Sequence, residues 1–340
     1  MRSTDVASAA IRAICAKLLP EFDLNFIEPA AIGHSVYRIV SAKGDRLALK
    51  LFADSGDRSS GPEALATEAA ALDQLHRLGC PVPRLVAADP NLGALAMEWI
   101  DGRTLEARLQ GRSLAPSERE SVLRSLAAME AAYQALTARR EPAAAAAHRE
   151  LITRTRHELT EIADCPPVAI DPADRERWAG ALEDAADAVT AGPWSYGSLD
   201  CSASNLLLAG DRAYVIDLSI LGAEWRERRT VRHAIATGSS HPEGRYASLF
   251  NSSSAATYSQ IFNPDAPTEA VAQLLDLHHL LVLFGALARQ RRSPNSPADR
   301  ERRRSLFGLF RRPLVPGGIA GALRDLLRPD ALEWANCGEV

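Results

Sequence analysis

The stretch Asp200-Cys-Ser-Ala-Ser-Asn205, followed by Tyr214-Val-Ile-Asp217, decides how this chain of 340 residues is interpreted. The residues between Asn205 and Asp217 read as a short apolar strand, a turn and a returning strand, which predicts a β-hairpin. The two ends of a hairpin lie together, so the oxygens of Asn205 and Asp217 would point at one place. Amide and carboxylate oxygens are ligands that Mg²⁺ accepts. Because the same residue types also serve as ordinary turn residues, the triplet alone leaves both interpretations open.

An apolar segment upstream contains a lysine. Residues 46–52 (Arg-Leu-Ala-Leu-Lys-Leu-Phe) predict a strand in which Ala48, Lys50 and Phe52 share one face. If this strand lines a cleft, Lys50 would reach the α- and β-phosphates of a nucleotide, and Ala48 would leave room for a flat base. The alternative is a lysine on an edge strand that faces water.

The helix predicted from Pro62 to about Leu78 carries an acidic residue on its apolar face. The apolar stripe consists of Leu65, Leu72 and Leu75. Glu68 lies on the same stripe, three residues after Leu65 and four before Leu72. A carboxylate on a core face is costly without a cation, so Lys50 in the preceding strand is the expected partner of Glu68. A surface salt bridge of Glu68 ranks second.

These residues, in this order, resemble the aminoglycoside phosphotransferase and choline kinase family, which has the protein-kinase-like fold. Two more segments carry the resemblance, Gly79-Cys-Pro-Val-Pro-Arg-Leu85 and the hinge-like Ala94-Leu-Ala-Met-Glu-Trp-Ile-Asp-Gly-Arg-Thr-Leu105. The resemblance implies a bilobal α+β fold. Residues 1–98 would form a small lobe with an antiparallel sheet and one helix, and residues 99–340 a larger, mainly helical lobe.

The resemblance also assigns roles. Lys50 would bind the phosphates of ATP, or of GTP, and Glu68 would hold Lys50 in place. Asp200 would be the catalytic residue that orients or deprotonates a hydroxyl of the acceptor. Asn205 and Asp217 would ligate Mg²⁺.

The remaining nucleotide contacts implied by the resemblance come from backbone. The segment with Met97, Glu98 and Ile100 would hydrogen-bond the base. Gly33 and Ser35 would belong to the hairpin that covers the phosphates, because glycine permits close backbone approach.

The chain departs from the family pattern around Asp200. The family usually has histidine two residues before the catalytic aspartate, where this chain has Ser198. A second alignment is possible, in which Tyr196-Gly-Ser198 places a serine at the position of the base. Asp200 is preferred because only this residue stands five positions before Asn205. The phosphate-covering hairpin is short, with one glycine, so a catalytically impaired nucleotide-binding pseudokinase or scaffold is one alternative function.

Between the hinge and Asp200 lie about a hundred residues that predict three helices, at 117–138, 148–162 and 174–189. This length is similar to that of small-molecule phosphotransferases, and no activation segment of a regulated protein kinase follows Asp217. The expected acceptor is therefore the hydroxyl of a small molecule such as an aminoglycoside, an amino alcohol or a sugar. A kinase acting on a protein or an envelope saccharide is the other alternative.

Composition restricts the partners and the compartment. A net charge of −4 argues against a general nucleic-acid binder. The five cysteines are scattered, without a C-x-x-C step, which fits a reducing cytoplasm better than a disulfide framework or zinc site. We expect no signal peptide and no stable membrane insertion, because the most apolar helix, residues 274–287, contains an aspartate and the pair His278-His279. A monomer or homodimer is expected.

Two sets of charged residues have more than one interpretation. Residues 289–312 contain nine arginines and are expected to be a solvated loop and helix face, although Phe307 and Phe310 leave a partner or membrane contact possible. Carboxylates that follow Asp217 are candidates for contacting a cationic acceptor, although no spacing singles out a site among Glu224, Glu227, Asp265 and Glu269.

Overall fold

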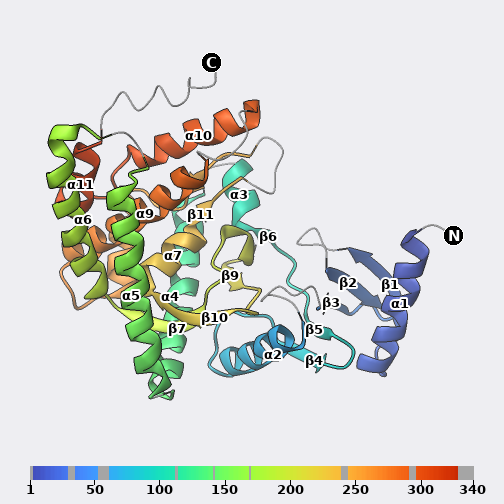
Figure 1. Ribbon diagram of the computed structural model, residues 1–340. Coiled ribbons are helices and arrows are strands. Elements are labelled where there is room, and N and C mark those ends of the chain that lie inside the picture. Colours follow the sequence, from blue (N-terminus) through green and yellow to red (C-terminus); the bar gives the residue numbers. More distant parts are fainter. Residues whose placement is uncertain are drawn as a thin grey trace. The chain divides into compact units, whose positions relative to one another are not determined.

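The computed structural model describes residues 3–29, 35–52, 61–111, 114–140, 142–167, 170–238, 244–290 and 296–327 (Figure 1). The chain forms two compact units. The small unit consists of Met1–Arg103 and Leu207–Leu221, and the large unit of Thr104–Leu206 and Gly222–Val340. This division differs from a single boundary after residue 98, because the hairpin that leads to Asp217 belongs to the small unit.

The small unit is built on a five-stranded antiparallel sheet with the strand order β1-β2-β3-β5-β4. Its strands are β1 (Leu24–Pro29), β2 (Val36–Ser41), β3 (Arg46–Leu51), β4 (Leu85–Asp89) and β5 (Ala94–Glu98), and its helices are α1 (Ser3–Leu18) and α2 (Gly61–Arg77). A second small sheet has the order β6-β8-β9, formed by β6 (Arg103–Thr104), β8 (Leu206–Ala209) and β9 (Arg212–Val215). The hairpin predicted between Asn205 and Asp217 is confirmed as β8 and β9.

Helix α1 covers one face of the five-stranded sheet. Ile11 and Cys15 of α1 pack against Ile39 and Leu49 in a common buried cluster. Because side chains alternate along a strand, Lys50, next to Leu49, lies on the opposite face, where Glu68 of α2 reaches it. The two helices therefore serve different faces, and the lysine points away from the apolar cluster.

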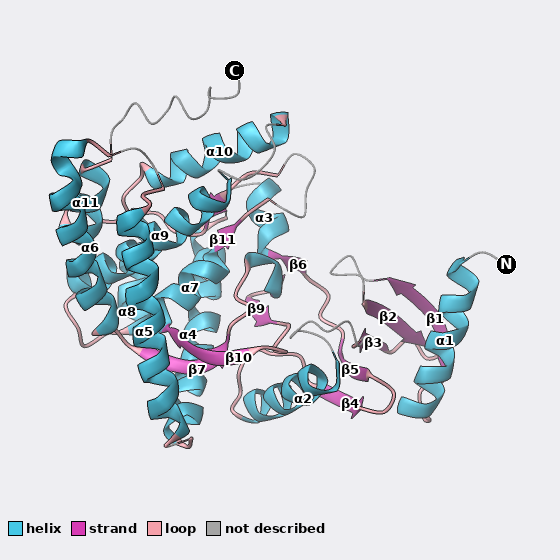
Figure 2. Ribbon diagram, viewed as in Figure 1, coloured by secondary structure: helices cyan, strands magenta, loops and turns pink. Residues whose placement is uncertain are grey.

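The large unit is mainly helical (Figure 2). In chain order its elements are α3 (Leu105–Gly111), α4 (Pro116–Ala138), α5 (Ala143–Asp164), η1 (Pro172–Asp174), α6 (Arg175–Thr190), β7 (Trp194–Ser198), η2 (Ala203–Asn205), β10 (Leu221–Trp225), α7 (Arg226–Ala234), β11 (Ile235–Ala236), β12 (Ala247–Ser248), α8 (Ser252–Phe262), α9 (Thr268–Gln290), α10 (Pro297–Phe310) and α11 (Gly318–Asp325). Strand β7 pairs with β10, and β11 with β12. The three helices expected before Asp200 are confirmed as α4, α5 and α6.

Local signals explain where two of these helices begin. Asn251 caps α8 by accepting a hydrogen bond from the Ser254 amide at 2.9 Å. Ser296 caps α10 by accepting from the Asp299 amide at 3.2 Å, and a proline occupies the first turn. Both caps satisfy backbone donors that a helix start would otherwise leave unpaired.

Helix α9 is the central helix of the large unit. By length and composition it is the one described helix long and apolar enough to cross a membrane, and 67% of its most apolar stretch is buried inside the structure. His278 and His279 are both fully buried, where core or rim positions were expected. Asp276 forms two hydrogen bonds of 2.7 Å with Arg324 of α11, so the charge within α9 is neutralised.

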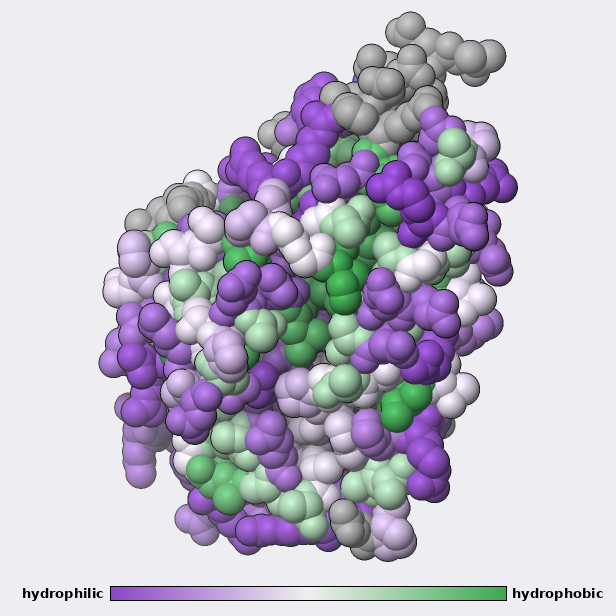
Figure 3. All heavy atoms as spheres, turned by 90° about the vertical axis from the view of Figure 1, so that its left-hand side faces the viewer, coloured by the Kyte–Doolittle hydropathy of each residue, from purple (hydrophilic) through white to green (hydrophobic). Residues whose placement is uncertain are grey.

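The aromatic residues of the basic tail belong to the core. Phe307 and Phe310 are buried, and the Phe310 ring lies 5.7 Å from that of Phe284 in α9. The alternative that these two residues contact a partner or a membrane is disfavoured, because both are buried and anchor α10 to the unit. Over α6 and α11, polar side chains predominate on the surface, and apolar side chains appear among them (Figure 3).

Candidate active site

A buried lysine links two carboxylates within the small unit. The Lys50 ammonium lies 2.7 Å from Oε2 of Glu68 and 2.8 Å from Oδ1 of Asp217. Glu68 is completely buried and Lys50 is 8% exposed, so this is no surface salt bridge. The pairing of Lys50 with Glu68 follows the prediction, whereas the direct contact between Lys50 and Asp217 was not foreseen.

The two carboxylates determine the charge state of this lysine. Burial by itself would lower the pKa of Lys50, but the charges of Glu68 and Asp217 outweigh burial and raise the pKa. Burial would likewise raise the pKa of Asp217, but Lys50 and hydrogen bonds from Ser219 lower the pKa below its ordinary value. The site therefore holds a fixed ammonium and an ionised aspartate.

Asp217 has an unusual backbone conformation. Its φ of 60° places it in the left-handed region, and among the described residues it is the one non-glycine with positive φ. The Ser219 hydroxyl donates to Oδ1 of Asp217 at 2.8 Å, which holds the carboxylate toward Lys50. Such a conformation costs about 1–3 kcal/mol and tends to occur at functional positions.

The residues expected to contact the nucleotide differ in burial and in how their backbone groups are already hydrogen-bonded. Ala48 and Met97 are cross-strand partners, and both are buried. The Glu98 amide donates to the Arg84 carbonyl at 2.9 Å, so this donor is already used within the sheet. Ile100 is buried. Ser35 is exposed and accepts a hydrogen bond from the Leu51 amide, while Gly33 lies outside the described residues.

The large unit carries the loop with Asp200 and Asn205. The Asn205 side-chain amide donates to the Asp200 carbonyl at 3.0 Å, which closes the five-residue step into a compact turn. Because its nitrogen is the donor, Asn205 retains its side-chain oxygen as an acceptor. Cys201 is buried, and burial raises the pKa of its thiol to about 12, so the thiol stays protonated at neutral pH. A reactive role for Cys201 is thereby disfavoured.

Ser198, the residue that the alternative alignment would make the base, is less accessible than Asp200. The Ser198 side chain is completely buried, while Asp200 is partly exposed. Gly197 has a packing reason to be glycine, because a Cβ atom there would lie 2.5 Å from the Tyr133 ring. The Tyr-Gly-Ser sequence therefore reflects packing against α4.

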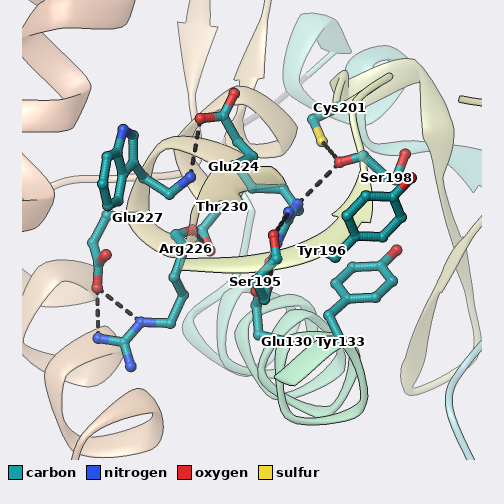
Figure 4. Close-up of polar contacts among 12 residues, drawn as sticks. Glu130, Tyr133, Ser195, Tyr196, Ser198, Cys201, Glu224, Arg226, Glu227 and Thr230 are labelled. Atoms are coloured by element: carbon teal, nitrogen blue, oxygen red, sulfur yellow. Dashed lines mark hydrogen bonds and ion pairs between the residues drawn. The ribbon is translucent and has the colours of Figure 1, made fainter. Parts of the chain in front are cut away.

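The buried Arg229 holds the strand that leads to Asp200, and Figure 4 labels three of its partners, Glu130, Ser195 and Ser198. Nη1 of Arg229, in α7, lies 2.7 Å and 2.8 Å from the carboxylate oxygens of Glu130 in α4. The same guanidinium donates to the Ser195 carbonyl at 2.9 Å and, through Nε, to the Ser198 carbonyl at 3.0 Å. Both ends of β7 are thus fixed by one side chain, two residues before Asp200.

A second residue of α7 contacts the same loop. Nδ1 of His233 lies 3.3 Å from the Ser202 carbonyl, and His233 stands one helical turn after Arg229. Burial lowers the pKa of His233 to about 4, so the imidazole is neutral at neutral pH. Arg229 and Glu130 were missed because their pairing joins residues far apart in sequence. The available signal was a charge-dense segment, Arg226-Glu-Arg-Arg229, between the apolar residues Trp225 and Val231.

Two of the carboxylates considered for a cationic acceptor are engaged internally. Glu227 is completely buried and accepts from Arg226 Nε at 2.8 Å and from the Tyr258 hydroxyl at 3.1 Å. Glu224 is 2% exposed, and its Oε1 accepts from the Trp225 amide at 3.0 Å (Figure 4). Asp265 and Glu269 are exposed near the start of α9.

The sheet with its buried lysine and the helical unit with its aspartate loop define a protein-kinase-like α+β fold. The profile of the phosphotransferase enzyme family matches residues 25–227. Since this match covers more than half of the chain, the protein belongs to the phosphotransferase enzyme family.

Solved structures have the same fold. A choline/ethanolamine kinase family protein from Mesorhizobium loti matches with a TM-score of 0.52 at 14% identity, over 94% of this chain and 99% of that one. A macrolide 2′-phosphotransferase from Brachybacterium faecium matches with a TM-score of 0.52 at 18% identity, over 88% and 97%. The GDP complex of aminoglycoside 2′-phosphotransferase-IIIa matches with a TM-score of 0.56 at 12% identity, over 88% and 97%. No curated protein matches the chain.

Proposed function

We propose that this protein transfers the γ-phosphoryl group of ATP to a hydroxyl of a small molecule. The observation that carries the proposal is the buried Lys50, held between Glu68 and Asp217 in the small unit. A desolvated lysine with two carboxylate partners is a costly arrangement that a purely structural strand does not need. In phosphoryl transfer, a fixed cation steadies the phosphates that are not transferred.

In this proposal Lys50 binds the α- and β-phosphates, and Glu68 keeps its ammonium in place. The nucleotide base would lie near Ala48, with backbone groups of Met97 to Ile100 as hydrogen-bonding partners. GTP remains a second candidate, since one solved structure with this fold is a GDP complex. Gly33 and Ser35 would contribute to the cover over the phosphates.

Asn205 and Asp217 would be the ligands of Mg²⁺, since each side chain carries an oxygen donor that this ion accepts. Asp217 is ionised, and Asn205 retains an amide oxygen because its nitrogen already donates to the Asp200 carbonyl. Hard oxygen donors of this type suit Mg²⁺, which would neutralise charge on the nucleotide phosphates when bound.

Asp200 would position the acceptor hydroxyl and accept its proton as the oxygen attacks the γ-phosphorus. The oxygen–phosphorus bond to the acceptor forms while the bond from the γ-phosphorus to the β,γ-bridging oxygen breaks, which releases ADP. Most of the rate acceleration would come from alignment and charge neutralisation, because little covalent chemistry is required of the protein. The candidate acceptors are aminoglycosides, amino alcohols and sugars.

A catalytically impaired nucleotide-binding protein is the second candidate, favoured by Ser198 at the position usually held by histidine. The network of Arg229 and Glu130 argues for the active enzyme, because it holds the Ser198 carbonyl without that histidine. A kinase for a protein or an envelope saccharide is the third candidate. We also propose a cytoplasmic location, since the four cysteines in the described part of the chain form no disulfide with one another.

Mass spectrometry of a metabolite extract tests the proposal. The extract, supplemented with aminoglycosides, sugars and amino alcohols, is incubated with MgATP or MgGTP and either wild type or Asp200→Asn. We expect one class of compound to gain a phosphoryl group with wild type alone. Absence of any shifted small molecule, together with labelling of a macromolecule, would favour the third candidate; absence of both, without nucleotide consumption, would favour the impaired protein.

A further inference from the structure

Three guanidinium groups surround a single carboxylate oxygen in the large unit. Nη1 of Arg232 lies 3.6 Å from Oε2 of Glu224, Nε of Arg228 lies 3.9 Å from it, and Nη2 of Arg154 lies 4.0 Å from it. All three distances exceed that of a hydrogen bond, so the carboxylate attracts the guanidinium groups without occupying their donors. Nη2 of Arg154 donates instead to the Ala223 carbonyl at 3.2 Å, which leaves the other nitrogens of this guanidinium for a ligand. The other oxygen of Glu224 is used by the Trp225 amide. We call this group the arginine cluster.

The arginine cluster carries more positive charge than its carboxylates neutralise. Glu158 is the closest acidic partner, 2.7 Å from Nη1 of Arg228. Two carboxylates, Glu224 and Glu158, therefore face three guanidinium groups, which leaves one positive charge in excess. In the part of the chain that the structure describes, the Arg232 guanidinium makes one ion-pair contact, the 3.6 Å approach to Glu224.

The side chains at the rim of the arginine cluster are open to solvent. The Arg232 side chain is 37% exposed and that of Arg154 is 42% exposed, whereas that of Glu224 is 3% exposed. An incoming ligand would therefore meet guanidinium donors before the carboxylate. A planar guanidinium can offer two parallel hydrogen bonds to the oxygens of a phosphate or carboxylate.

The arginine cluster borders the loop that carries Asp200. His233, adjacent to Arg232 in α7, contacts the Ser202 carbonyl at 3.3 Å. At the start of β10, Gly222 packs so closely on Leu199 that a Cβ atom would lie 2.6 Å from that side chain. The charges of Arg232 and Glu224 both act on Cys201, the residue after Asp200. The cluster and the candidate catalytic residue thus belong to one region of the large unit.

The two buried carboxylates of the same region, Glu227 and Glu130, are already paired with arginines. Their partners are Arg226 and Arg229 respectively. A cationic acceptor near α7 would have to displace an arginine from one of these pairs, and breaking a buried pair costs about 3–5 kcal/mol.

We propose that the acceptor carries an anionic oxyacid group, a phosphate or a carboxylate, which binds Arg232 and Arg154 while a hydroxyl of the same molecule approaches Asp200. This inference rests on the proposed function for the reaction, and it narrows the acceptor to a class. Amino alcohols and aminoglycosides, which are cationic, become the disfavoured acceptors.

Matched acceptors that differ in charge test the inference. Phosphoryl transfer from MgATP is measured for glycerol, glucose, their phosphate monoesters and ethanolamine, with wild type, Arg232→Gln and Arg154→Gln. We expect kcat/KM to be about tenfold or more higher for each phosphate monoester than for its parent alcohol, which corresponds to about 1.4 kcal/mol. In Arg232→Gln this preference should fall about tenfold, mainly through KM, and in wild type it should weaken as salt is added.

Arg156→Gln is the matched control, since Arg156 lies on the same helix as Arg154 but pairs with Asp187 at 2.7 Å and is half exposed. This variant should keep the preference of wild type. A higher kcat/KM for glycerol or ethanolamine would support the phosphotransferase function and overturn the anionic acceptor. An unchanged preference in Arg232→Gln would equally overturn the assignment.

A binding measurement tests the anion site separately from the proposed phosphotransferase activity. Isothermal titration calorimetry measures the affinity of glycerol phosphate and of glycerol for each protein, whether or not any acceptor is phosphorylated. Binding of glycerol phosphate that is lost in Arg232→Gln and kept in Arg156→Gln supports the anion site even if turnover is absent. Binding that is equal in all variants, or absent from wild type, overturns it.

Discussion

Replacing the buried pair of Arg229 and Glu130 should separate stability from catalysis. Arg229 is 1% exposed and donates to Glu130, to the Ser195 carbonyl and to the Ser198 carbonyl. Removing either partner leaves a charge buried without its counter-ion, which typically costs about 3–5 kcal/mol. Glu130→Leu and Arg229→Met should each lower the free energy of unfolding by about this amount.

The double variant should be less destabilised than the sum of the single variants. With both charges removed, no ion remains unpaired, and the residual cost comes from carbonyls of β7 that lose a donor, about 1–3 kcal/mol each. We therefore expect a coupling energy of at least about 2 kcal/mol in a double-mutant cycle, measured by urea unfolding at pH 7.

The double variant should regain part of its stability but not the kcat of wild type. In the double variant the Ser198 carbonyl has lost Arg229, so the loop that carries Asp200 is less well positioned. We expect kcat to stay at least about tenfold below that of wild type under conditions where the double variant is folded, because small misplacements of reacting groups are costly. Arg124→Met with Glu120→Leu removes an exposed pair from the same helix, and it should change stability by at most about 1 kcal/mol.

Additive effects of the two single variants would refute the coupling argument. A double variant with the kcat of wild type would refute the positioning of the loop by Arg229. Either result would leave the buried network as ordinary packing between α4, α7 and β7.

Three further predictions concern other parts of the two units. Glu68→Gln removes one of the two carboxylates that hold Lys50, so kcat/KM for MgATP should fall about tenfold to a hundredfold in steady-state kinetics. Gly197→Ala forces a Cβ atom against the Tyr133 ring, and urea unfolding should show a loss of about 1–3 kcal/mol. Acid should destabilise the fold between about pH 6.5 and pH 4, because burial lowers histidine pKa values to between about 3 and about 4, as at His233, His278 and His279.

The sign of the acid effect follows from proton uptake. In this pH range the unfolded chain binds protons that the buried histidines do not, so stability falls as pH is lowered and is restored by pH 7. At pH 5 each histidine should cost about 2 kcal/mol relative to pH 7. His278→Leu should make the pH dependence shallower, whereas His157→Leu, at an exposed position, should leave it unchanged. Stability that is flat over this range would contradict the argument.

Glu68→Gln and Gly197→Ala each have a matched control variant. Glu63→Gln, at the start of the same helix but outside its buried face, should leave kcat/KM unchanged. Gly111→Ala meets no atom within 4 Å and should be neutral or slightly stabilising. A Glu68→Gln variant with wild-type kinetics would show that Lys50 is positioned by Asp217 alone, and a neutral Gly197→Ala would show that the Tyr133 ring moves aside.

Parts of the fold governed by local periodicity were predictable from sequence. The stripe of α2 placed Glu68 on a buried face, and a buried carboxylate required a cation, so its pairing with Lys50 could be inferred before the structure. The β8–β9 hairpin followed from an apolar run interrupted by a turn. Roles that depend on bound ligands, such as those of Asp200, Asn205 and Asp217, remain predictions.

Contacts between distant segments were not predictable in the same way. Glu130 and Arg229 stand 99 positions apart, and nothing in either segment specifies the other. A partner or membrane contact of Phe307 and Phe310 was left open because the packing of α10 on α9 is not visible in a local pattern. Glu224 was a candidate for contacting a cationic acceptor because it follows Asp217. Its three arginine neighbours come from two different helices, so their approach to Glu224 is not visible in a local pattern.

Transfer of an isotopically labelled phosphoryl group tests the central claim most directly. ATP labelled with ¹⁸O at the three non-bridging oxygens of its γ-phosphate is incubated with Mg²⁺, the acceptor panel and either wild type or Asp200→Asn. We predict that wild type yields one acceptor whose new phosphoryl group carries all three labelled oxygens, while Asp200→Asn yields at most a small fraction of it. ADP formation with the label found only in inorganic phosphate, or equal transfer by the two proteins, would contradict the account.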